Sequence, residues 1–68
     1  MKDRNAITIL IYEKAVENRF YYLSAGNNDS KIKANAYIEL LLDIDNTVSW
    51  ENMINKKALS YMERKEAK

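Results

Sequence analysis

The side chains with the clearest potential for chemistry are two carboxylates, Asp43 and Asp45, in the stretch DIDNTVS. In a calcium-binding EF-hand loop, alternate oxygen ligands of this kind fill positions 1 and 3, and Thr47 would fill position 5. Such a loop also needs glycine at position 6 and glutamate at position 12, where this chain has Val48 and Ile54. Because the two most diagnostic positions do not match, we expect no metal site and interpret the aspartates as turn residues.

Familiar enzyme chemistry lacks its usual residues in this chain. A serine, threonine or cysteine nucleophile needs a neighbouring base, most often histidine, and the sequence contains neither histidine nor cysteine. A phosphate-binding loop needs several glycines, and the chain has one. We therefore predict a protein that is not an enzyme and that binds no cofactor.

A basic segment near the end of the sequence supports a different function, the binding of nucleic acid. Together with a turn and the preceding helix, this segment could form a helix-turn-helix. The formal net charge of the chain is only +1, which argues against a dedicated polyanion-binding protein. We keep nucleic-acid binding as the alternative function, with the candidate residues Lys56, Lys57, Tyr61, Arg64, Lys65 and Lys68.

The elements that must position these residues are helices. The chain has no proline, and its single glycine, Gly26, lies in the loop-like run GNNDS. A second break, DIDNTVS, separates two further amphipathic segments. We predict an all-α fold of three helices, at about 4–25, 30–44 and 49–65, with the first the longest and central. Residues 6–12 are β-branched enough to form a strand, but no second such run exists to pair with them.

Local signals predict where these helices begin and end. Gly26 suits the left-handed position that follows the last residue of a helix. Asp29 and Ser30 are both good N-cap residues for the second helix, and Ser49 is one for the third.

The first helix carries apolar side chains on two sides. One stripe has the spacing of a core-facing surface and contains Ile9, Tyr12, Val16, Phe20 and Leu23. A second stripe lies nearly opposite and contains Ile7, Ile11, Ala15 and Tyr22. A helix that is apolar on two sides is normally buried on two sides. We expect the two shorter helices to cover only the first stripe.

A second copy of the chain is the simplest cover for the second stripe. A chain below about 70–80 residues rarely stabilises itself with one core, and disulfides are excluded here. We therefore predict a homo-oligomeric helical bundle, with a dimer favoured. The alternatives are a monomer whose shorter helices straddle the first, and a complex with another protein. The expected interface residues are Ile7, Leu10, Ile11, Ala15, Tyr21 and Tyr22.

Length and composition place the chain among small globular proteins. Residues 1–68 form one domain, in which 47% of residues are apolar and 31% are charged. No apolar run approaches the about 18 residues of a transmembrane helix, so we expect a cytoplasmic protein without membrane contact. Frequent Asn, Lys and Ile favour an AT-rich bacterial or phage genome. The favoured function is that of a small, non-enzymatic protein–protein interaction or regulatory accessory protein.

Overall fold

The chain folds into three α-helices. The computed structural model describes the backbone of residues 2–67 and the side chains of residues 6–63. The helices are α1 (Lys2–Ala25), α2 (Asn28–Ile44) and α3 (Trp50–Ala67), with no strand between residues 2 and 67. The expected all-α fold is therefore confirmed, including the helical state of residues 6–12.

The turn between α1 and α2 reverses the chain over two residues. Gly26 has a φ of 67°, and its N–H donates to the carbonyl oxygen of Tyr22 at 2.8 Å, as a left-handed helix end requires. The next residue, Asn27, is the N-cap of α2, because its side-chain oxygen accepts from the N–H of Ser30 at 3.2 Å. The prediction of Asp29 or Ser30 as N-cap is therefore wrong. Because Gly26 completes the reversal in one step, α2 begins at Asn28, two residues before the predicted start at residue 30.

The turn between α2 and α3 is organised by Asp45. Its N–H donates to the carbonyl oxygen of Leu41 at 2.9 Å and ends α2. Its carboxylate accepts from the N–H and the hydroxyl of Thr47, at 3.0 and 2.6 Å. Its carbonyl oxygen accepts from the indole N–H of Trp50, the first residue of α3, at 2.8 Å. Asp45 thus has the turn role that the sequence predicted.

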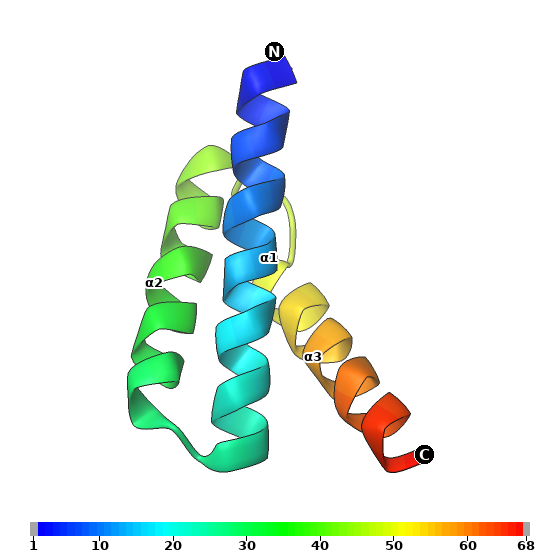
Figure 1. Ribbon diagram of the computed structural model, residues 1–68. Helices are drawn as coiled ribbons and strands as arrows, with labels where there is room; N and C mark the ends of the chain where they lie inside the picture. The colour runs from blue at the N-terminus through cyan, green and yellow to red at the C-terminus, as the bar shows by residue number, and fades with distance from the viewer. Residues whose placement is uncertain (1, 68) are drawn as a thin grey trace.

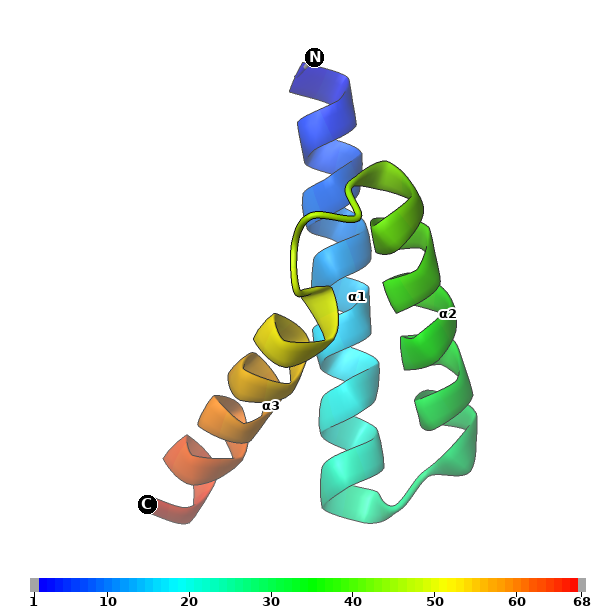
Figure 2. The same ribbon diagram turned by 180° about the vertical axis from the view of Figure 1, so that it is seen from behind.

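The longest helix, α1, lies at the centre of the arrangement. Figure 1 shows α2 running back alongside α1 in the opposite direction, while α3 begins near the middle of α1 and diverges from it. The reverse view in Figure 2 shows the connection from α2 crossing α1 before α3 begins. Both shorter helices pack against α1 and make little contact with each other. The bundle is therefore closed on the α2 side and splayed on the α3 side.

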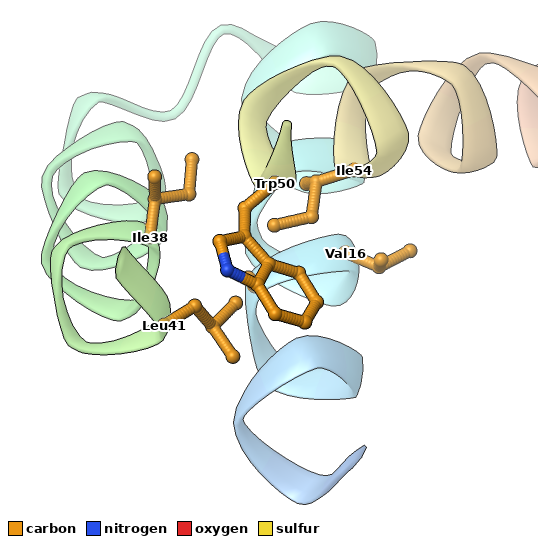
Figure 3. Close-up of a cluster of buried hydrophobic side chains, with 6 residues drawn as sticks. Val16, Ile38, Leu41, Trp50 and Ile54 are labelled. Carbon is orange, nitrogen blue, oxygen red and sulfur yellow. The ribbon is translucent and has the colours of Figure 1, made fainter. Parts of the chain in front are cut away.

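The hydrophobic core lies where the three helices approach one another. Figure 3 shows the ring of Trp50 among Val16 of α1, Ile38 and Leu41 of α2, and Ile54 of α3. The largest fully buried side chains are Leu41 and Ile54. Small side chains permit the helices to come close, and three of them are completely buried: Ala15, Ala34 and Ala58.

Candidate interaction surface on helix α1

One side of α1 is covered by α2. The guanidinium of Arg19, a buried residue, donates from Nη2 to Oδ1 of Asn35 at 3.2 Å. The ring of Tyr22 lies near two cations, with Arg19 Cζ at 5.8 Å and Lys31 Nζ at 5.4 Å from its centroid. Such cation–π contacts hold Tyr22 against the start of α2. The second apolar stripe of the sequence, which includes Tyr22, therefore faces α2.

Another side of α1 is covered by the beginning of α3. The rings of Tyr12 and Trp50 lie 6.2 Å apart at 54°, a tilted arrangement favoured by aromatic pairs. Val16 is buried in the same cluster. Both apolar stripes are thus covered in part by the chain itself. The expectation that the shorter helices cover only the first stripe is wrong, because the core direction of α1 lies between the two stripes.

The six expected interface residues occupy different environments. Ala15 is fully buried within the chain and Ile11 packs against the core, so these two have little surface for a second copy. Tyr22 is half-buried beside α2. The remaining three are exposed: Ile7, Leu10 and Tyr21. At 100° per residue, their side chains point within about 60° of one another around α1. Self-association itself stays a prediction.

A groove opens where α3 diverges from α1, with a volume of about 790 Å³. Its lining comes from these two helices and consists of Ile9, Tyr12, Glu13, Val16, Glu17, Phe20, Tyr21, Lys57 and Tyr61. Ile9 and Leu23, which were expected in the core, are exposed. The groove was not predictable from helical periodicity, because periodicity shows which residues share a face of a helix and not how far a neighbouring helix extends along that face. The available signal for the groove was that the first helix has more aromatic residues at the spacing of core positions than one small core needs.

The groove has an apolar floor and charged rims. Helical geometry places Tyr12 and Val16 deepest, with Ile9 and Phe20 above them on α1. Burial, and to a lesser degree the negative charge that Tyr61 acquires on ionisation, raise the pKa of the Tyr12 hydroxyl above its ordinary 10. The phenol therefore stays neutral at physiological pH. Such a lining offers apolar contact and three tyrosine hydroxyls, which suits binding.

The residues of the nucleic-acid alternative are only partly described. Lys56 is exposed on α3. Lys57 places its Nζ 5.6 Å from the centre of the Tyr61 ring and lines the groove. The other three, Arg64, Lys65 and Lys68, lie outside the described side chains. A continuous basic surface stays a prediction.

The described residues form neither a metal-binding cluster nor a membrane-spanning helix. They contain no group of three or more Asp, Glu, His or Cys side chains close enough to hold a metal ion. They also contain no helix of the length and hydropathy needed to cross a membrane. Comparisons of the chain with models of protein families, with curated proteins and with solved structures find no match.

Proposed function

We propose that the chain is a small, non-enzymatic interaction protein that associates with a second copy of itself through α1. The observation that carries this proposal is the open groove between α1 and α3, with the exposed apolar side chains beside it. Tyr21 joins the two features, because it lines the groove and also belongs to the exposed set with Ile7 and Leu10. The proposed surface therefore runs from Ile9 in the groove to Tyr21 at its edge. It replaces the second apolar stripe as the interface.

The exposed area of the chain supports association. A compact monomer of 8.0 kDa exposes about 4,450 Å² if surface scales with mass in the usual way. The chain exposes 5202 Å². The excess of about 750 Å² is close to the about 800 Å² that each partner buries in a standard interface. Burial of that area against a second copy would bring each chain to the exposure expected of a compact 8.0 kDa monomer.

Mass in solution tests the proposal. Light scattering over a concentration series should give twice the mass of the chain at high concentration. Ile9→Asp, at a position 57% exposed in the monomer, should shift the protein to the monomer without loss of helicity. Ile32→Asp on α2, at a position 66% exposed, is the matched control and should keep the wild-type mass. A helical wild-type protein with a mass of 8.0 kDa at every concentration would refute the proposal.

A further inference from the structure

The two rims of the groove carry opposite charges. On α1, Glu13 and Glu17 project about 40° and 80° farther round the helix than Ile9, toward the outer edge. On α3, the rim contains Lys57. Glu17 Oε1 lies 3.9 Å from Lys14 Nζ, and this ion pair runs along α1 and not across the groove. Lys57 is directed to Tyr61 of its own helix. The acidic and basic rims therefore remain available to a partner.

Two copies that meet groove to groove can be related by a twofold axis in the plane of contact. If the axis runs along the groove, it places the acidic α1 rim of each copy opposite the basic α3 rim of the other. If the axis runs across the groove, it places the α1 rims opposite each other, so that Glu13 and Glu17 face the same residues of the second copy. Both arrangements bring the apolar floors together, and only the first pairs unlike charges.

We infer that two copies associate through the α1–α3 grooves about a twofold axis that runs along the groove. The two α1 helices are then parallel, and Glu13 and Glu17 of each copy face the partner's Lys57. The inference rests on the proposed self-association and adds to it the occupant of the groove and its orientation. Rim charges contribute more to orientation and to exclusion of wrong arrangements than to affinity. The apolar floor, with Tyr12, Val16 and Phe20, supplies the affinity.

Charge reversal tests the orientation. The α1-rim variant is Glu13→Lys/Glu17→Lys, and the α3-rim variant is Lys57→Glu. Each alone places like charges opposite each other at both symmetric contacts, and we expect the dimer Kd to rise about tenfold at low ionic strength. The matched control is Glu39→Lys/Asp43→Lys, which reverses an exposed acidic pair with the same spacing on α2 and should leave the Kd unchanged.

Recombination of the two variants gives the decisive result. An equimolar mixture of the α1-rim and α3-rim variants should form a heterodimer with a Kd close to that of the wild type, because both contacts then join unlike charges. One chain that carries all three substitutions should likewise recover the wild-type Kd. Sedimentation equilibrium measures each Kd, and circular dichroism checks that every variant keeps its helicity.

Three other outcomes would overturn the inference in distinguishable ways. A dimer whose Kd is unaffected by either rim variant, and whose variants do not pair preferentially with the wild-type chain, associates through another surface, although self-association stands. An α1-rim variant that keeps the wild-type Kd on its own and pairs preferentially with the wild-type chain indicates the axis across the groove. A wild-type protein that stays monomeric at every concentration refutes both the orientation and self-association.

Discussion

Three consecutive leucines in α2 provide a sharp test of how the helices pack. Leu41 is 0% exposed, whereas its neighbours Leu40 and Leu42 are 48% and 41% exposed. Truncation to alanine removes three carbons, worth about 2.4 kcal/mol at about 0.8 kcal/mol per buried methylene. At Leu41 a cavity term adds to this loss, so we expect a total of about 3–4 kcal/mol. At the two neighbours, where about half of the side chain is already in water, we expect about 1 kcal/mol each.

The loss at Leu41 is large for a chain of 68 residues, whose free energy of unfolding should be about 3–10 kcal/mol. Urea titration followed by circular dichroism measures the differences, since the midpoint should fall by about 3 M at a slope of about 1 kcal/mol per molar. Leu41→Met keeps the side-chain volume and should cost below about 1.5 kcal/mol. If Leu40→Ala or Leu42→Ala costs as much as Leu41→Ala at low protein concentration, the assignment of the buried face of α2 is wrong.

Three further predictions concern the turn and the groove. Gly26→Ala should lower the free energy of unfolding by about 1–2 kcal/mol. An added Cβ meets nothing within 4 Å, so this loss is conformational. Gly26→Asn should lower the free energy of unfolding less in the same urea titration. Asn27→Ala removes the N-cap of α2 and should cost about 1 kcal/mol, whereas Asn27→Ser should keep most of the stability. Burial and the Tyr61 charge raise the pKa of Tyr12, so the folded state holds this proton more tightly than the unfolded state. Its contribution to stability should therefore be complete below about pH 10 and be lost as pH rises through the folded pKa, and Tyr12→Phe should remove this loss from a titration that extends above about pH 10.

The helices were predictable because their signals are local. A single glycine with a φ of 67° marks the end of α1, and the absence of proline permits 24 residues of uninterrupted helix before it. The β-branched run 6–12 is helical in spite of its propensity, because a strand needs a partner and the chain offers none. The one local error, the N-cap at Asn27, arose because Asn27, Asp29 and Ser30 are all competent caps. Sequence alone gives no reason to choose among them.

The packing was not predictable, because it depends on contacts between distant residues. Periodicity assigns Ile9 and Val16 to the same stripe, yet Ile9 is exposed and Val16 is buried. The difference lies in the path of α3, which starts at Trp50, held by the carbonyl oxygen of Asp45, and then diverges from α1. That path is set by the α2–α3 turn and by the Tyr12–Trp50 contact, and neither has a periodic signature in the sequence. The candidate groove, which exists because of this path, was therefore missed.

The splayed α3 connects the stability of the protein to its proposed association. The core contains two large, fully buried side chains, Leu41 and Ile54, and the chain has no cysteine to add a disulfide. A core of this size supplies only a few kcal/mol in a chain below about 70–80 residues. Burial of Ile9, Phe20 and the groove floor against a second copy would stabilise the folded state and not the unfolded state.

Because association of this kind stabilises only folded chains, the thermal midpoint should rise with protein concentration. For a dimer that unfolds as it dissociates, helicity and mass should be lost in one transition, measured by circular dichroism and light scattering on the same samples. Ile9→Asp should abolish the concentration dependence, and Ile32→Asp, at an exposed position of α2, should keep it. A midpoint that is independent of concentration in the wild-type protein would show that the core of one chain is sufficient, and would separate the stability of the fold from self-association.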